Sequence, residues 1–164
     1  MTRSAAVPSP SDPLHEFHLT LAGREWTVLH VGVVAVSHDD ESRYLRDVRE
    51  KRSLLPYGVA LWPSAIALAH ELASRGKEAF AGKTVLELGA GTGLPGIVAA
   101  SLGAARVVQT DRDESALTVC RRNGARNNAT NIEHRLVDWT DWHDETRYDW
   151  IIGADILYGE ALHP

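Results

Sequence analysis

A run of glycines is the part of this sequence with the clearest potential for chemistry. The segment Val85–Gly96 begins as an apolar stretch, passes through Gly89, Gly91 and Gly93, and continues into a helical pattern. Glycines at such a turn adopt positive φ and let a ligand approach the backbone without a Cβ in the way. The segment therefore predicts a strand, a ligand-binding loop and a helix, in that order.

Acidic residues lie on both sides of this loop. Glu87 precedes the glycines, and Asp111 follows them at about the distance where an acid binds a ribose hydroxyl in dinucleotide-binding proteins. Gly91, Gly93 and Gly96 also satisfy the pattern G-x-G-x-x-G, which taken alone points equally well to NAD. The position of Glu87 ahead of the glycines argues against an NAD-dependent dehydrogenase.

The glycine segment is also part of a wider resemblance. Leu86–Gly93 resembles motif I of the class I S-adenosylmethionine-dependent methyltransferases. The similarity extends through Leu61–Ala65, Thr110-Asp111, Asp138-Trp139 and Gly153–Tyr158. Together these motifs resemble the family-16 group, which includes the seven-β-strand protein lysine methyltransferases and the nicotinamide N-methyltransferase-like enzymes. The resemblance covers roughly Pro56 to Tyr158, about two thirds of the chain.

The resemblance implies S-adenosylmethionine as cofactor, S-adenosylhomocysteine as product, and a set of cofactor-binding residues. In the family the methionine part lies beside the glycine loop, the acid after the second strand binds the ribose hydroxyls, and residues after the third strand bind adenine. The matching residues here are Trp62, Glu87, Gly89, Ala90, Gly91, Asp111, Asp138, Trp139 and Ala154. Two alternatives stay open: Trp62 and Trp139 could be packed core aromatics, and Asp111 could cap a helix, a role that Asp113 also fits.

The catalytic assignment follows from the same resemblance. Asp155 and Tyr158 match the D-x-x-Y motif after the fourth strand, which lines the acceptor side of the cleft. Methyl transfer is an in-line displacement, in which good alignment supplies roughly 7 to 11 kcal/mol. A carboxylate stabilises a lysine ammonium in its protonated form, so we expect Asp155 to position the acceptor. No metal is expected, and His134, His143 and His163 are interpreted as solvated side chains.

Alternating strand and helix patterns predict the elements that position these residues. A β-hairpin is expected between Glu16 and Val36 with its turn at Ala22-Gly23. Pro63 suits the first position of a helix for which Gly76 is a plausible end. The expected strands are 84–88, 106–110, 132–137 and 149–154, with helices over 94–102 and 114–126. This order predicts an α/β fold, a Rossmann-like parallel sheet flanked by helices, with an N-terminal β-hairpin extension.

The predicted organisation has three parts. Residues 1–13 are expected to be a flexible tail, 14–55 an extension with the hairpin and a densely charged segment over 38–52, and 56–164 the N-terminal part of a methyltransferase domain. A class I sheet has seven strands, so this chain is expected to be truncated after the fourth core strand. Trp150, Ile151 and Ile152 would then form an exposed apolar edge that favours self-association or aggregation.

Composition narrows the class of protein further. The chain has 164 residues, 44% hydrophobic and 24% charged, with a formal net charge of -5. This is the balance of an ordinary globular domain without the basic surplus of a nucleic-acid binder. We expect no signal peptide and no membrane span. Cys120 is the only cysteine, which excludes an intrachain disulfide and favours the cytoplasm.

The sequence therefore predicts a cytoplasmic S-adenosylmethionine-dependent N-methyltransferase acting on a lysine of a protein partner. The alternatives are an N-methyltransferase for a small amine or a nicotinamide-like heteroaromatic, and a non-catalytic scaffold with the methyltransferase fold. The intact glycine run, Glu87, Asp111 and Asp155–Tyr158 argue against the scaffold. Nucleic acid and membrane are not expected as partners.

Overall fold

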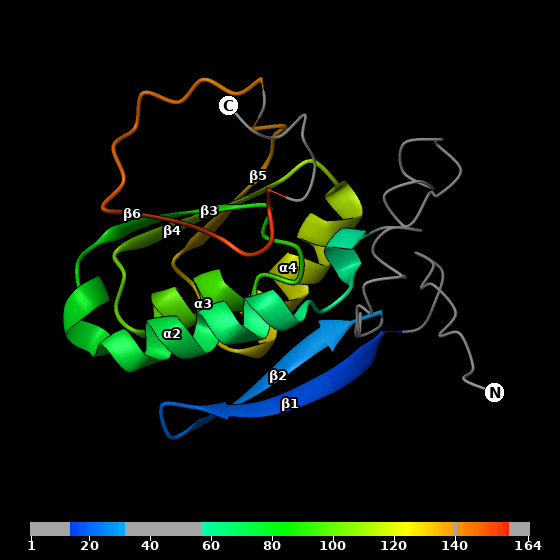
Figure 1. Ribbon diagram of the computed structural model, residues 1–164, viewed down its shortest axis with the longest axis vertical. Coiled ribbons are helices and arrows are strands. Elements are labelled where there is room, and N and C mark those ends of the chain that lie inside the picture. Colours follow the sequence, from blue (N-terminus) through cyan, green and yellow to red (C-terminus); the bar gives the residue numbers. More distant parts are fainter. Residues whose placement is uncertain (1–13, 32–56, 140, 158–164) are drawn as a thin grey trace.

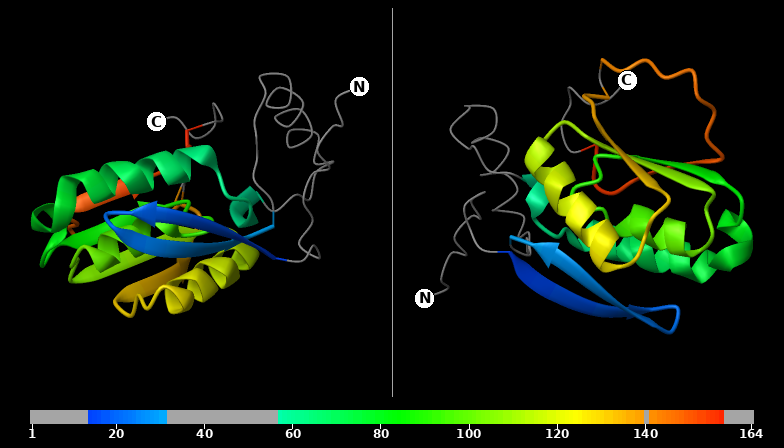
Figure 2. Two further views of the ribbon diagram at one scale, coloured as in Figure 1. Left: turned by 90° about the horizontal axis from the view of Figure 1, so that it is seen from below. Right: turned by 180° about the vertical axis from the view of Figure 1, so that it is seen from behind.

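The computed structural model of the chain describes residues 14–31, 57–139 and 141–157. A four-stranded parallel sheet forms the centre, with the strand order β5-β4-β3-β6. The three α-helices of the described residues lie together on one face of this sheet, and a separate hairpin lies beyond them (Figure 1, Figure 2). The expected α/β fold with an N-terminal hairpin is confirmed.

The sheet is built around the strand that carries the glycine motif. β3 (Thr84–Leu88) pairs on one side with β4 (Arg106–Asp111), which in turn pairs with β5 (Ile132–Leu136). On its other side β3 pairs with β6 (Trp150–Gly153). In parallel strands the carboxyl ends meet at one edge of the sheet, which is where ligands bind in open α/β folds.

The helices begin and end largely where the sequence predicts. They are α2 (Pro63–Phe80), α3 (Leu94–Ser101) and α4 (Glu114–Arg126). Pro63 is the first residue of α2, as expected. Gly76, expected to end that helix, is a kink instead: it has φ 74° and ψ 178°, and a short helical stretch resumes after it and continues to Phe80.

The N-terminal hairpin consists of β1 (His15–Leu21) and β2 (Arg24–His30). Its two turn residues, Ala22 and Gly23, both have positive φ, 51° and 73°, as a two-residue turn requires when it follows the twist of the strands. Trp26 of β2 is buried, donates from Nε1 to the Leu21 carbonyl, and joins the main core. The hairpin is thus packed onto the domain.

The core lies between the sheet and the helices. Alternate residues of β3 and β4, such as Val85 and Val107, point into this layer and are fully buried. Almost all of α3 is buried as well. This packing explains why β6 presents less apolar surface than expected: Ile152 is 7% exposed, Trp150 stacks on Phe80 and donates to the Ala79 carbonyl, and Ile151 alone of the three is strongly exposed.

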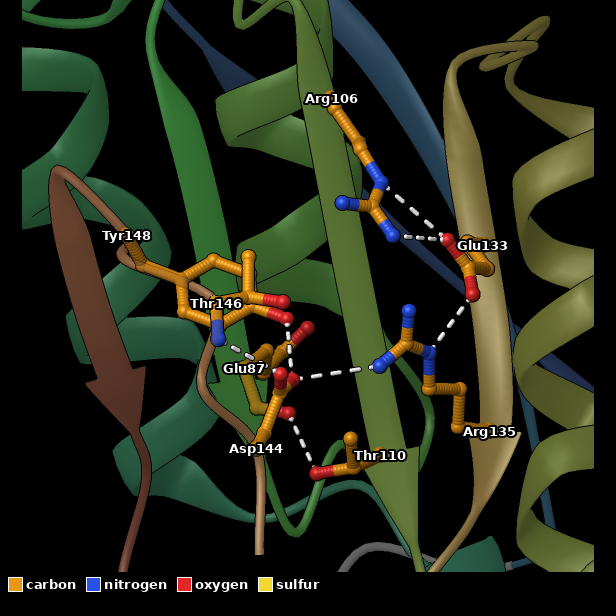
Figure 3. A network of polar contacts seen from close by, with 8 residues as sticks. All are labelled: Glu87, Arg106, Thr110, Glu133, Arg135, Asp144, Thr146 and Tyr148. Atoms are coloured by element: carbon orange, nitrogen blue, oxygen red, sulfur yellow. Dashed lines mark hydrogen bonds and ion pairs between the residues drawn. The ribbon is translucent and has the colours of Figure 1, made fainter.

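The opposite face of the sheet carries a network of ion pairs and hydrogen bonds, shown in Figure 3. Glu133 of β5 accepts from both Arg106 and Arg135, and Arg135 also reaches Asp144 in the connection to β6. Asp144 accepts further bonds from Thr146 N and from the Tyr148 hydroxyl. These contacts tie the connection 137–149 to the sheet and hold the pKa of Asp144 at about 2, chiefly through its bonds with Thr146.

Several expectations lie outside the described residues: the tail 1–13, the end of the hairpin region (32–36), the charged segment 38–52, Tyr158 and His163. His134 differs from its expected solvated state, because its Nε2 atom is buried and burial lowers the pKa of the ring. Within the described part of the chain, no helix combines the length and apolar character that a membrane crossing requires.

Candidate cofactor site

Residues from distant parts of the chain meet at the carboxyl edge of the sheet. The glycine loop follows β3 and is tied to the end of β4 by a hydrogen bond from Ala90 N to Thr110 O, 2.8 Å long. Val137 N donates to Asp111 O at 2.9 Å, so the segment after β5 starts beside the acid that ends β4. The predicted cofactor residues are therefore brought to one edge.

The backbone of the glycine loop has a conformation that is energetically unfavourable for residues other than glycine. Gly89, Gly91 and Gly93 all have positive φ, 59°, 56° and 79°, which costs a residue with a Cβ about 1 kcal/mol or more. A Cβ on Gly93 would also overlap with the Cys120 sulfur and lie 2.9 Å from Nε2 of Gln109. The glycines thus allow both the turn and its close packing on β4 and α4.

A small pocket opens where this loop leaves β3. It is lined by Ala60, Trp62, Ala65, Glu87, Gly89, Ala90, Gly91, Thr92, Pro95 and Ala154. Trp62, Glu87, Gly89, Ala90, Gly91 and Ala154 were predicted from the sequence. The small side chains of Ala60 and Ala65, which the sequence analysis missed, face the loop from the segment before α2 and from its first turn.

Glu87 is the buried acid of the pocket. Its side chain is 2% exposed, and Oε2 accepts hydrogen bonds from Gln109 Nε2 at 2.6 Å and from Gly96 N at 3.1 Å. Burial raises the pKa of Glu87 to about 8, although the two hydrogen bonds work in the other direction. A buried carboxyl group beside a pocket is a fit for a ligand ammonium group, because an opposite charge favours the ionised form that burial disfavours.

Gln109 connects Glu87 to the rest of the interior. Its amide nitrogen also donates to the Gly93 carbonyl at 2.8 Å, and its amide oxygen accepts from the Cys120 thiol at 3.0 Å. Burial raises the pKa of Cys120 well above its ordinary value, so the thiol stays protonated and acts as a donor. Neither residue was assigned to the site from the sequence, since each occupies an ordinary core position of its element.

Asp111 holds the loop from the end of β4. Its Oδ2 accepts from Gly91 N at 3.0 Å, and its Oδ1 accepts from Asp113 N at 3.0 Å. The side chain is buried, which raises its pKa. The helix-cap alternative does not apply to it, because Asp113 is the N-cap of α4 and accepts from Ser115 N.

Asp138 and Trp139 follow β5 at the same edge, but neither lines the pocket beside the loop. Asp138 is exposed and Trp139 is half-buried. Trp62, in contrast, lines the pocket and also packs against the main core. Trp62 thus packs against the core and also lines the pocket, and its contact with the cofactor stays a prediction.

The turn after β6 closes the other side of the pocket. Ala154 lines it, and Asp155 beside it is exposed with φ +55°, in the left-handed region. Ile156 packs back onto two glycines: a Cβ on Gly153 would lie 2.6 Å from its Cδ1, and one on Gly89 would lie 3.0 Å from its Cγ2. Ile156, also missed in the sequence analysis, therefore seats the turn against the glycine loop.

The geometry fits an elongated ligand with a charged amino-acid end and a ribose. The pocket beside Glu87 offers an acid and bare loop backbone, and Asp111 offers a second carboxylate at the next strand end, directly behind Gly91. Carboxylates can accept two hydrogen bonds from the hydroxyls of a diol. The residues present therefore suit the cofactor that the resemblance implies.

Comparison with known proteins agrees with this geometry. A family model described as lysine methyltransferase matches residues 41–164. The chain is 37% identical over 122 residues to protein N-lysine methyltransferase METTL21A of Xenopus tropicalis, covering 72% of this chain and 56% of that protein. It is 42% identical over 116 residues to METTL21A of Danio rerio, covering 65% and 52%.

A relative with a different printed activity is nearly as similar. The chain is 35% identical over 124 residues to histone-arginine methyltransferase METTL23 of Mus musculus, covering 71% of this chain and 48% of that protein. The chain thus spans about half the length of the curated relatives it matches.

Proposed function

Because this chain belongs to the lysine methyltransferase family, we propose that it binds S-adenosylmethionine at the carboxyl edge of its sheet and methylates a lysine nitrogen of a protein. The observation that carries the proposal is that Glu87 and the glycine loop line one pocket and that Asp111 binds the backbone of this loop at Gly91. These residues come from two adjacent strands, β3 and β4. Their arrangement supplies separate contacts for the amino-acid end and the ribose of the cofactor.

Each part of the site has a distinct role in holding the cofactor. The amino-acid end lies beside Glu87 and the backbone of Gly89–Gly91, and the ribose hydroxyls donate to Asp111. Asp138 and Trp139 at the end of β5 bind the adenine. Trp62 and Ala154 cover the pocket from two sides, which the pocket lining supports.

The chain's own contribution to the chemistry is alignment and desolvation. When bound, the cofactor supplies a methyl group on a sulfonium ion, which needs only a correctly placed nucleophile. A lysine acceptor must first lose a proton, at a cost of roughly 4 to 5 kcal/mol at neutral pH. Desolvation favours the neutral amine, while Asp155, at the end of β6 beside Ala154, orients the incoming acceptor; Tyr158 is assigned to the same role by its motif.

The identity of the acceptor rests on the relatives. METTL21A relatives are named protein N-lysine methyltransferases, which supports lysine. METTL23 relatives are named histone-arginine methyltransferases, which makes arginine the second candidate. An arginine stays protonated at neutral pH and would need the carboxylate of Asp155 more than a lysine would.

Two experiments test the proposal in order. Isothermal titration of the chain with S-adenosylhomocysteine and with NAD should show binding of the first ligand alone. Incubation with labelled S-adenosylmethionine and a cell lysate, followed by mass spectrometry, should then place the label on protein lysine. Label on arginine would select the second candidate, and label only in small molecules would refute a protein acceptor.

A further inference from the structure

Two asparagines, Asn123 of α4 and Asn127 directly after this helix, lie along the outer edge of β2. Leu29 N donates to Asn123 Oδ1 at 2.7 Å, and Asn123 Nδ2 donates back to Leu29 O at 3.0 Å. One helical turn later, Thr27 N donates to Asn127 Oδ1 at 3.3 Å and Asn127 Nδ2 donates to Thr27 O at 2.8 Å. Each side-chain amide thus pairs with the backbone N–H and the carbonyl of one β2 residue, as the backbone of a neighbouring strand would.

Asn123 differs from Asn127 in its second donated hydrogen bond. Nδ2 of Asn123 also donates to the Thr92 carbonyl in the glycine loop at 2.8 Å. Nδ2 of Asn127 donates instead to the Asn123 carbonyl within α4 at 2.9 Å. Thr92 is buried and lines the pocket. One fully buried amide therefore joins the hairpin, α4 and the cofactor loop.

A second set of contacts connects the hairpin to the same loop. Val31, directly after β2, donates from its backbone N to the Val59 carbonyl at 2.9 Å. Val59 ends the short 3-10 helix η1 (Tyr57–Val59). The carbonyl of Gly58 in η1 lies 3.2 Å from where a Cβ on Gly91 would be. The hairpin end and the glycine loop are therefore near neighbours on either side of η1.

The glycine loop needs hydrogen bonds from other elements to hold a single conformation. Glycines adopt positive and negative φ with similar ease, so Gly89, Gly91 and Gly93 set no single loop conformation by themselves. A buried carbonyl that loses its donor is costly to leave unpaired. The Thr92 carbonyl can keep its present place only while a donor faces it.

We propose that Asn123 is a positioning residue through which the N-terminal hairpin fixes the conformation of the glycine loop for cofactor binding. The inference rests on the proposed function, because it takes the loop to be the cofactor site. In this arrangement Asn123 touches no ligand. It acts through Thr92, and the hairpin acts through Asn123.

The matched variants Asn123→Asp and Asn127→Asp test this inference. Each substitution removes two donated hydrogen bonds and keeps the acceptor that β2 uses. Hydrogen exchange of residues 89–93 in the full chain without ligand should accelerate in Asn123→Asp and not in Asn127→Asp, because Asn127→Asp leaves the contacts of Asn123 with Leu29 and Thr92 in place. The affinity for S-adenosylhomocysteine should fall about tenfold more in Asn123→Asp than in Asn127→Asp.

The outcomes separate the two proposals. Equal loop exchange in the two variants would refute the role of Asn123, and so would equal losses of affinity. Failure of the unmodified chain to bind S-adenosylhomocysteine would refute the proposed function, while loop exchange would still decide whether Asn123 fixes the loop. If a buried carboxylate prevents folding, the pair Asn123→Ala and Asn127→Ala gives the same comparison.

Discussion

Gln109 donates from its side-chain amide to Oε2 of Glu87 at 2.6 Å, in the interior behind the glycine loop. The same oxygen accepts from Gly96 N, so a single carboxyl group connects β3, β4 and the start of α3. Burial raises the pKa of this carboxyl group to about 8. At a pH between 4.5 and about 8, the folded protein therefore holds a proton on Glu87 that the unfolded chain has lost.

The first prediction concerns Glu87→Gln and pH. Between the ordinary pKa of 4.5 and the raised value of about 8, the folded state binds one proton more than the unfolded state. The free energy of unfolding therefore falls as pH rises through this window, by up to roughly 1.4 kcal/mol per pH unit from this group. Glutamine cannot lose a proton and keeps an acceptor for Gln109 and Gly96, so Glu87→Gln removes this slope.

Urea unfolding of both proteins at several pH values across this window checks the prediction. The stability of Glu87→Gln relative to the unmodified protein should increase with pH. Burial also raises the pKa of Asp111, but its charge is the smallest of the causes that shift Glu87, so most of the Asp111 contribution is common to both proteins and cancels in the difference. If the free energies of unfolding of the two proteins changed equally with pH, a raised pKa at Glu87 would be contradicted.

The second prediction distinguishes Asp111 from Asp113. Asp111→Ala should weaken S-adenosylhomocysteine binding by about tenfold or more, because the ribose hydroxyls and Gly91 N lose a charged acceptor. Asp113→Ala removes the N-cap of α4 and should cost about 1 kcal/mol of stability with affinity nearly unchanged. Titration calorimetry and thermal unfolding of both variants measure these effects. Similar affinity losses would mean that Asp111 acts only through the local backbone.

The third prediction concerns the acceptor side. Asp155 has positive φ, and asparagine tolerates this conformation better than alanine does, so Asp155→Asn removes the charge with little backbone strain. Methyl transfer should fall about tenfold or more, while the affinity for S-adenosylhomocysteine stays nearly constant. Glu145→Gln, a neutralised exposed acid in the connection before β6, is the control and should keep full activity. Equal turnover in both variants would remove Asp155 from the site.

The fourth prediction compares two glycines in helices. A Cβ on Gly96 in α3 would overlap with Glu87 Oε2 and lie 2.5 Å from Gln109 Nε2, so Gly96→Ala should destabilise the fold by about 1 to 3 kcal/mol. A Cβ on Gly124 in α4 would meet nothing closer than 3.8 Å. Gly124→Ala should therefore stabilise it by about 0.5 to 1 kcal/mol through helix propensity. Chemical unfolding of both variants measures these changes in the free energy of unfolding. Changes of the same sign in the two variants would contradict the prediction.

Local sequence signals predicted the elements of this fold well. The strand over Thr84–Leu88 and the helix over Glu114–Arg126 have the predicted bounds, because apolar runs, Pro63 and the glycines are strong local determinants. The Ala22-Gly23 turn was predicted on the same grounds. The prediction that α2 ends at Gly76 was wrong. One glycine with positive φ kinks the helix, and a helical stretch that includes the buried Phe80 follows it.

Contacts between distant elements could not be predicted in the same way. Asn123 lies in a polar stretch of α4 that resembles a solvated face, yet it is fully buried by β2 and the glycine loop. Gln109 looks like one polar residue in an apolar strand, and its partner Glu87 is 22 residues away. The exposure of Trp150 and Ile152 was overestimated because their burial depends on α2 and the central core. The domain boundaries, the roles of the cofactor and acceptor residues, self-association and the cytoplasmic location stay predictions.

The two neighbours of β3 come from very different places in the chain. β4 follows after a single helix, whereas the start of β6 is fixed by Asp149, which binds Thr84 from 65 residues further on. Contacts of long sequence separation form late, because a longer loop must close first. On the ribosome, β3, the glycine loop, β4 and α4 emerge together, and Ala154 and Asp155 follow only afterwards. A nascent chain thus contains the Glu87 and Asp111 parts of the cofactor site before Ala154, which lines the other side of the pocket, and before the acceptor residue Asp155.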